Sequence, residues 1–268
     1  MPIECSIKLP RLSHEEMKAL DYEVMKRAFA SHTELGRLCD ETTYQADLAA
    51  RLEATGLGPV RREARIAVTH RDFVKTYELD LVIAERAVYE LKTTAALAPD
   101  HKAQLLNYLL LTDSARGKLV NFRPCSVQSE FVNTELTHET RRRFDVDRQR
   151  WCGDENLIGL MCDLLNDWGF FLEVSLYVQA LTHFLGGETR VIQQVPMSRS
   201  GIVLGNQRFH LLDTDTAFRI TAYTAALHHQ ERSLCRMLRL SPLKEMHWIN
   251  MNHHHASFVT LRREGQEN

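Results

Sequence analysis

The sequence predicts an α/β protein, a mixed sheet flanked by helices, with a diverged second copy of similar topology in the C-terminal half. Three observations support this prediction: apolar residues at helical spacing near the N-terminus, runs of β-branched and aromatic residues after them, and the return of the same order of segments later in the chain. Helices and strands that follow one another in this way pack as layers around a shared core.

The elements of the first half follow from local patterns. Met17, Leu20, Val24 and Ala28 recur at the period of a helix that is buried on one side, and the segment that begins at Tyr44 continues the pattern. Segments rich in Val, Ile, Leu and Tyr, separated by polar breaks, are typical of the strands of a meander. The expected helices cover 14–35, 44–52 and 100–112, and the expected strands cover 62–68, 73–84, 87–94, 117–122 and 127–132.

Composition limits the class of protein. With 268 residues, of which 44% are hydrophobic and 25% charged, the chain has room for one large or two modest globular domains. It has no apolar run long enough to span a membrane and no signal-peptide layout, so we expect a cytoplasmic protein with no membrane partner. The six cysteines form no C-x-x-C pair, which favours buried thiols over a zinc site. Because the formal net charge is -2, a nucleic acid would have to be held by local basic patches.

Residues 77–94 carry Asp80, Glu90 and Lys92 inside an otherwise apolar run. If 84–86 form the turn of a hairpin, Asp80 faces Glu90 on one side of the sheet, with Cβ atoms roughly 4.5–5.5 Å apart. Lys92 shares that face, because side chains two apart in a strand point the same way. Facing carboxylates destabilise a sheet unless a cation lies between them, and hard oxygen ligands suit Mg²⁺ or Mn²⁺. The alternative interpretation is an exposed sheet edge with a simple Glu–Lys pair.

Asp80, Glu90 and Lys92 form the pattern D-x9-E-x-K, which resembles the core motif of the PD-(D/E)XK nuclease superfamily. Gln104 and Tyr108 add the Q-x-x-x-Y spacing that is typical of its RecB-like branch. A mixed sheet flanked by helices is the fold that this resemblance implies.

Residues 14–133 resemble, more specifically, the bacterial GxxExxY proteins. The resemblance includes Glu41 and Tyr44 at the E-x-x-Y spacing, and Gly36 within a His-x-x-Leu-Gly element. It departs at Leu38, which stands where the family has its naming glycine. This departure affects the start of a helix and no expected metal ligand.

The resemblance implies a nuclease that depends on Mg²⁺ or Mn²⁺ and hydrolyses the phosphodiester bonds of DNA, with RNA not excluded. The implied metal ligands are Asp80, Glu90, Glu41 and the backbone carbonyl of Leu91. Lys92 would orient or deprotonate the attacking water and offset charge in the transition state. Gln104 and Tyr108 would bind the substrate or hold Lys92 in place. The alternative function is a non-catalytic nucleic-acid-binding or regulatory protein with a relic nuclease fold.

The second half repeats the pattern of the first without its chemistry. Gly169 and Tyr177 have the spacing of Gly36 and Tyr44, and Asn250 aligns with Asn121. In this alignment the counterparts of Asp80, Glu90 and Lys92 are Phe209, Arg219 and Thr221. We therefore expect a nuclease-like domain at 1–133, a charged linker at 134–152 and a degenerate nuclease-like or accessory domain at 153–268. Such a chain would be a pseudo-dimer.

Neither of two clusters of potential metal ligands in the second half indicates a metal site. His253 and His255 would share one face of a strand, but no third ligand accompanies them, so exposed histidines at a strand end are expected. Asp213 and Asp215 are expected in a solvated turn.

Overall fold

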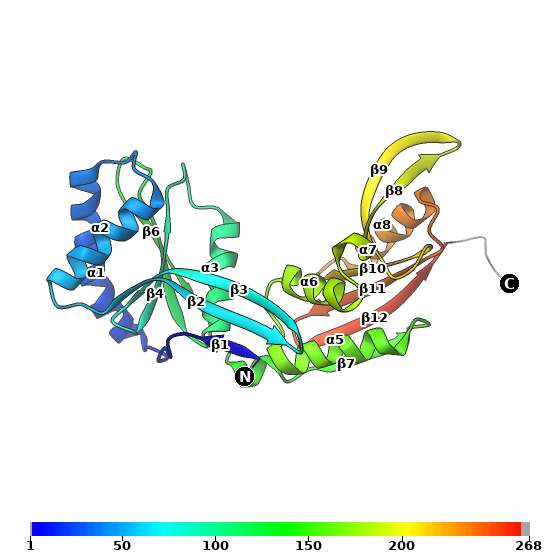
Figure 1. The fold of residues 1–268 in the computed structure, drawn as a ribbon, viewed down its shortest axis with the longest axis horizontal. Helices are drawn as coiled ribbons and strands as arrows, with labels where there is room; N and C mark the ends of the chain where they lie inside the picture. The colour runs from blue at the N-terminus through cyan, green and yellow to red at the C-terminus, as the bar shows by residue number, and fades with distance from the viewer. Residues whose placement is uncertain (1, 264–268) are drawn as a thin grey trace. The chain divides into compact units, whose positions relative to one another are not determined.

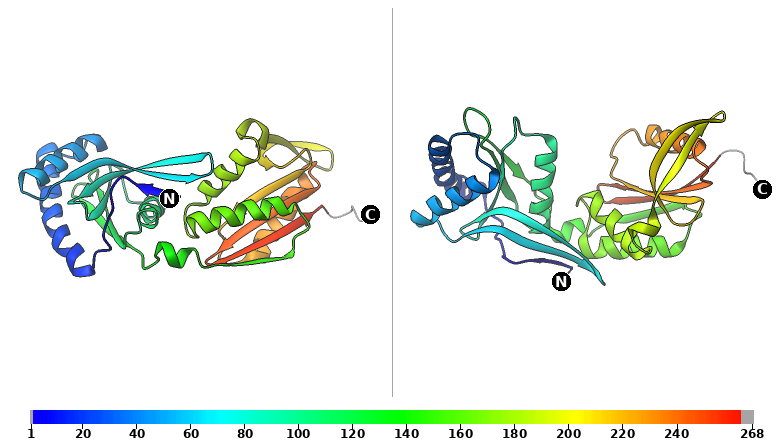
Figure 2. Two further views of the ribbon diagram at one scale, coloured as in Figure 1. Left: turned by 60° about the horizontal axis from the view of Figure 1, so that its bottom comes forward. Right: turned by 45° about the horizontal axis from the view of Figure 1, so that its top comes forward.

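The computed structural model describes residues 2–263 and divides into two compact units. The first unit comprises the chain up to Thr69 together with Val74–Thr140, and the second comprises His70–Phe73 and the chain from Arg141 onward. Each unit contains a six-stranded mixed sheet with helices packed on it (Figures 1 and 2). The predicted α/β class is therefore confirmed. Among the described helices, none combines the length and the apolar character that a membrane crossing requires.

In the first unit the strands pair in the order of the chain. The helices are α1 (His14–Leu35), α2 (Glu41–Ala54), α3 (Pro99–Leu111) and the short α4 (His138–Arg141) at the end of the unit. The strands are β1 (Ile3–Cys5), β2 (Val60–His70), β3 (Phe73–Ile83), β4 (Ala87–Lys92), β5 (Arg116–Asn121) and β6 (Gln128–Asn133). β4 and β5 run parallel, joined by α3, whereas β3–β4 and β5–β6 are antiparallel. This mixed arrangement is the one that the order of segments predicted.

Alternation along β3 and β4 separates a core face from a polar face. Leu81, Tyr89 and Leu91 are fully buried in a cluster with residues of α1 and α2. Because successive side chains of a strand point to opposite faces, Asp80 and Glu90 lie on the other side of the sheet. Figure 2 shows α1 and α2 on one side of this sheet and α3 on the other. The charged residues of the motif therefore share the face that α3 covers.

Five strands of the second unit have the order of five strands in the first, but the remaining strand joins the opposite edge of the sheet. Its helices are α5 (Glu155–Trp168), α6 (Val174–Phe184), α7 (Glu188–Val191) and α8 (Leu227–Leu240). Its strands are β7 (Asp145–Arg150), β8 (Ile192–Arg199), β9 (Ile202–Leu211), β10 (Thr216–Thr221), β11 (Glu245–Asn252) and β12 (His255–Arg262). The order β8-β9-β10-β11-β12 includes a parallel pair, β10 and β11, joined by α8. The topology of β8 to β12 thus matches that of β2 to β6.

Two local hydrogen-bond motifs recur in both units. The hydroxyl of Tyr44 donates to the carbonyl of Gly36 at 2.6 Å, and that of Tyr177 donates to the carbonyl of Gly169. Both glycines end a helix with a positive φ, 71° and 78°, which a residue without a Cβ adopts without strain.

The second motif is an asparagine near the end of β5 in the first unit and of β11 in the second. The amide of Asn121 bonds both the N–H and the carbonyl of Thr94, at 3.1 and 2.8 Å. The amide of Asn250 does the same to Tyr223, at 2.9 and 3.0 Å. The residues that aligned in the sequence therefore occupy matching places in the two sheets.

The segment expected as a charged linker is largely structured. Its residues 145–150 form β7, which pairs in parallel with β12 at the edge of the second sheet, and Arg141 is fully buried. An edge strand turns charged side chains toward water without losing its ladder, so charge density did not exclude a strand here.

The histidine cluster lies at a tight turn. His253 has a φ of 52° in the turn between β11 and β12, and His255 pairs with Asp145. No group of three or more His, Cys, Asp and Glu side chains within residues 2–263 is arranged to hold a metal ion.

Candidate functional site

The hairpin of β3 and β4 positions the charged residues of the first unit. Leu81 pairs with Tyr89 and Ile83 with Ala87, which confirms the predicted register. Beyond Leu81 the ladder is replaced by a side-chain contact, because Oδ2 of Asp80 accepts a hydrogen bond from the N–H of Leu91 at 2.8 Å. The carboxylate of Asp80 is thereby held beside the backbone that links Glu90 to Lys92.

Lys92 lies between the two carboxylates. Its Nζ is 2.6 Å from Oε1 of Glu90 and 4.0 Å from Oδ2 of Asp80. Glu90 is only 1% exposed, and its second oxygen, Oε2, is buried without a hydrogen-bond partner among the described residues. A buried carboxylate oxygen without a donor is costly, so this atom is a candidate ligand for a cation.

The three groups perturb one another's titration. Burial, and then repulsion by Asp80, raises the pKa of Glu90 to about 8, although Lys92 opposes the change. Burial likewise raises the pKa of Asp80. Burial lowers the pKa of Lys92, but the attraction of Glu90, Asp80 and Glu41 outweighs it and the net pKa is raised. At neutral pH the lysine is therefore an ammonium, and the carboxyl pair retains a proton unless a cation replaces it.

Glu41 is the first residue of α2 and lies beside the end of β4. Burial is the main cause of the raised pKa of its carboxyl group, which Lys92 lowers and Asp80 raises. The backbone of Thr93 lowers the pKa of this carboxyl group as well. Glu41 is thus within electrostatic reach of the motif.

Gln104 and Tyr108 interact with each other on α3. Nε2 of Gln104 donates to the hydroxyl of Tyr108 at 3.0 Å, which the i, i+4 spacing on one helix face allows. Burial raises the pKa of Tyr108, and the charges of Glu90 and Asp80 add to the increase. Gln104 is exposed whereas Tyr108 is buried, so the amide is the part of this pair that a substrate can reach.

One further acidic residue near the site was not predicted from the sequence. Glu63 of β2 contributes to the raised pKa of Asp80, and its backbone has a φ of 52°. No spacing rule links it to the D-x9-E-x-K pattern, because its place depends on how β2 bends beside β3. An irregular strand residue of this kind has no sequence signal that could have identified it.

A divalent cation fits the donor set of the first unit. Asp80 and Glu90 supply facing carboxylates, and the partnerless Oε2 of Glu90 supplies a free ligand atom. Mg²⁺ is commonly held by one or two carboxylates, with water and substrate phosphate as its other ligands. Two carboxylates are therefore sufficient without the larger cluster that the described residues lack.

The matching place in the second unit carries different groups. Lys92 pairs with Asn121 across β4 and β5, and Thr221 pairs with Asn250 across β10 and β11. By this ladder Arg219 holds the position of Glu90. The second unit therefore has the same frame with a guanidinium in place of the buried carboxylate.

The first unit combines a mixed sheet with two carboxylates and a lysine on one hairpin. The family model described as the PD-(D/E)XK nuclease superfamily matches residues 18–134. The predicted superfamily is confirmed for this part of the chain, and members of this superfamily are generally nucleases that hydrolyse phosphodiester bonds. A search of the curated proteins and a search of the solved structures each find no match.

Proposed function

We propose that the first unit is a nuclease that hydrolyses the phosphodiester bonds of DNA with Mg²⁺ or Mn²⁺. One observation carries the proposal: Asp80 and Glu90 are held together on one hairpin, beside Lys92, with a buried oxygen of Glu90 lacking any donor. Without a cation this arrangement is costly, because the two carboxyl groups avoid repulsion only by retaining a proton and Oε2 of Glu90 has no donor. The arrangement becomes favourable when a cation and a phosphate enter.

The side chains have separate roles in this proposal. Asp80, Glu90 and the carbonyl of Leu91 would hold the metal ion, which supplies Lewis-acid polarisation of the scissile phosphate when bound. Glu41 would complete the acidic side of the site. Lys92 acts as a positive donor rather than as a base, because its pKa is raised. Its ammonium would orient the attacking water and offset negative charge that develops on the phosphate.

The exposed amide of Gln104 is the proposed contact to the DNA backbone. The hydroxyl of Tyr108 accepts a hydrogen bond from that amide and so limits its orientation. Both residues belong to the Q-x-x-x-Y pattern, and on this basis we propose membership of the RecB-like branch. We propose membership of the GxxExxY family on the basis of Glu41 and Tyr44 at the E-x-x-Y spacing.

We further propose that the second unit arose by duplication of the first. The shared strand order, the tyrosine–glycine bond and the bracketing asparagine support this origin. The two copies, 1–133 and 153–268, would then form a pseudo-dimer with a single catalytic site.

A non-catalytic, nucleic-acid-binding protein is the second candidate. The observation that favours it is the close pair of Lys92 and Glu90, at 2.6 Å, which partly satisfies the site without a cation. In that case the motif would stabilise the fold and bind no metal.

Metal binding and single-turnover cleavage separate the two candidates. Calorimetric titration with Mn²⁺ should show binding to the wild type and none to Glu90→Ala or Asp80→Ala. Cleavage of single- and double-stranded DNA should disappear in the same variants. Glu85→Ala is the matched control, because Glu85 lies on the same hairpin but is exposed and pairs with Arg61. A wild type that neither binds Mn²⁺ nor cleaves DNA would refute the nuclease proposal.

A further inference from the structure

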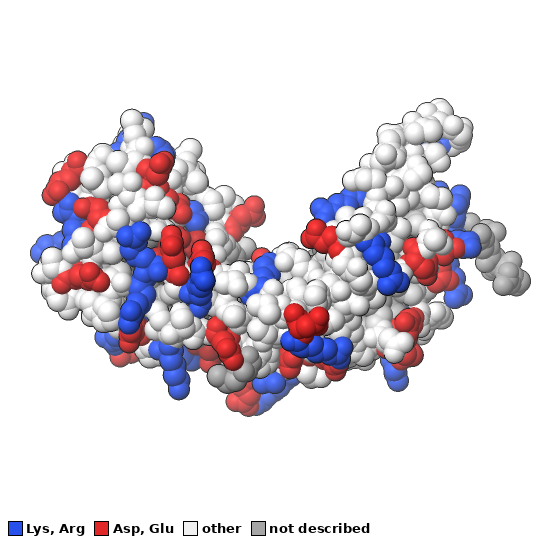
Figure 3. Space-filling model, viewed as in Figure 1, with Lys and Arg blue, Asp and Glu red and all other residues white. Residues whose placement is uncertain are grey.

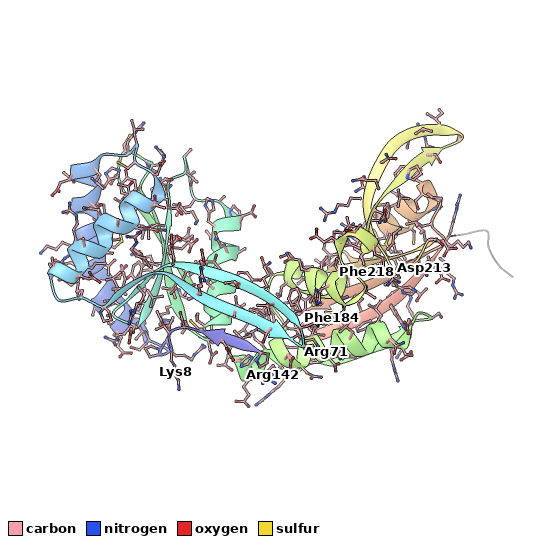
Figure 4. The ribbon with its side chains drawn as sticks, viewed as in Figure 1. Lys8, Arg71, Arg142, Phe184, Asp213 and Phe218 are labelled. Atoms are coloured by element: carbon pink, nitrogen blue, oxygen red, sulfur yellow. The ribbon has the colours of Figure 1, made fainter. Side chains whose placement is uncertain are left out.

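The second unit contains a cavity of about 780 Å³ next to the strand that carries Arg219. Arg208 and His210 of β9 line it, as do Ser175 and Gln179 of α6. Figure 4 marks Phe218, the neighbour of Arg219 on β10, whose side chain also lines this space. A cavity of this size accommodates a ligand as large as a nucleotide.

Positive charge dominates the polar lining. Burial lowers the pKa of His210, and the charges of Arg208 and Arg219 lower it further, so both guanidiniums act on the same ring. Neither guanidinium has a hydrogen bond or an ion pair with any residue of the described chain. Glu188 is the one acidic residue among those that line the cavity. Two unpaired cations beside a histidine attract an anion.

The elements around the cavity also favour an anionic ligand. Residues 189–212, which include β8 and β9, contain no Asp or Glu but include Arg199 and Arg208. In Figure 3 the ribbon of β8 and β9 is almost free of acidic side chains, and both basic and acidic side chains appear near its base. Val174 and Ser175, the first residues of α6, also line the cavity; a helix N-terminus favours negative charge, and the N-cap of this helix is Glu173.

The tip of the ribbon exposes apolar side chains. Ile202, Val203 and Leu204 are 61%, 75% and 52% exposed. Proteins that bind nucleic acids combine basic groups, which contact phosphates, with apolar side chains that pack against bases or sugars. The ribbon and the cavity together present both kinds of group on one element.

We propose that this cavity binds a phosphate group of a nucleic-acid strand, with Arg208 and Arg219 as its charge partners and the ribbon of β8 and β9 lying along the strand. Arg219 occupies the ladder position that Glu90 holds in the first unit, so the second unit has a guanidinium where the first has a carboxylate. The inference rests on the proposed nuclease function only for the choice of a polynucleotide as the anion.

Binding in the absence of cleavage tests the inference. Fluorescence anisotropy with labelled single- and double-stranded oligonucleotides in EDTA measures affinity for the full-length wild type, Arg208→Ala, Arg219→Ala and the double variant. Each single substitution should weaken binding on the order of 10-fold or more, because a hydrogen bond to a charged group is lost. Each should also reduce the slope of log K against log salt by about 1. Arg219→Lys should keep most of the salt slope.

Arg236→Ala is the matched control, because Arg236 is an exposed arginine of α8 in the same unit that does not line the cavity. It should leave affinity within about twofold of the wild type, as an ordinary surface charge does. Equal losses from Arg236→Ala and Arg219→Ala would overturn the proposal, since the effect would then be general charge. Competition by a mononucleotide as strong as by the oligonucleotide would overturn it as well, because the ligand would then be a free nucleotide.

The result of this binding assay does not depend on whether the protein cleaves DNA. If the wild type binds DNA through Arg208 and Arg219 but cleaves nothing, the site in the second unit stands and the nuclease proposal fails. If it cleaves DNA and the two arginine variants bind normally, the nuclease proposal stands and this inference fails.

Discussion

Replacing Glu90 by glutamine should make the metal-free protein more stable at pH 8 and leave its stability unchanged at pH 5. In the folded state the pKa of Glu90 is about 8, against an ordinary value of 4.5. The folded protein therefore holds a proton that the unfolded chain releases, and stability falls as pH rises from about 4.5 to about 8. At about 1.4 kcal/mol per pH unit, the full effect is on the order of 5 kcal/mol.

The attraction of Lys92 is already included in this raised pKa, because Lys92 is one of the groups that lower it. At pH 8 the folded carboxyl is about half ionised, which reduces the effect slightly. We expect the free energy of unfolding to rise by roughly 4 kcal/mol at pH 8. At pH 5 the wild-type carboxyl is protonated and similar in shape and charge to an amide, so the two proteins should be equally stable.

The assay has to follow the first unit alone. All three tryptophans, Trp151, Trp168 and Trp248, belong to the second unit, so tryptophan fluorescence does not report on β4. Urea unfolding in EDTA, read by a brief deuterium pulse on peptides that cover β4, measures the relevant transition. Adding Mn²⁺ should reverse the order at pH 8, because a ligand stabilises only the protein that binds it.

Glu85→Gln serves as the control in the same hairpin, and its stability should not depend on pH in this way. A difference between wild type and Glu90→Gln that is the same at pH 5 and pH 8 would refute the reasoning, since the carboxyl would then titrate normally.

Three further predictions follow from the contacts. Lys92→Ala should retain Mn²⁺ binding but lose roughly 10²–10⁴ in single-turnover cleavage rate, and loss of metal uptake in calorimetry would contradict its assigned role. Tyr44→Phe and Tyr177→Phe should each lower the free energy of unfolding by about 1–2 kcal/mol in urea titrations, because each leaves a glycine carbonyl without its donor. A loss of stability in only one of the two variants would argue against equivalent motifs. Gly153→Ala should lower the thermal midpoint of the second unit, because its Cβ would lie 2.4 Å from the His247 ring, and a normal midpoint would show that the ring moves freely.

Several features of the fold could be predicted because they depend on local patterns. The register of β3 and β4 follows from a short turn and from alternation with a period of two, so the facing of Asp80 and Glu90 is set within one hairpin. Helix α1 begins at a capping box of Ser13 and Glu16 and ends at Gly36, all within the pattern that its sequence displays. Local geometry of this kind needs no information from distant parts of the chain.

Other features were decided only by the tertiary structure. β7 is a strand because β12, more than 100 residues later in the chain, offers it a free edge. The pKa of Glu90 and the isolation of its Oε2 arise because α3 and the neighbouring strands exclude water, and burial depends on what packs from afar.

The same distinction applies to the second unit. The alignment of the two halves in the sequence predicted that Arg219 stands where the first half has the carboxylate of Glu90. Only the tertiary structure placed Arg208, His210 and the first turn of α6 around one cavity with it. The physical reason is that a side chain's chemical identity belongs to the sequence, whereas its electrostatic surroundings are created when distant segments pack together.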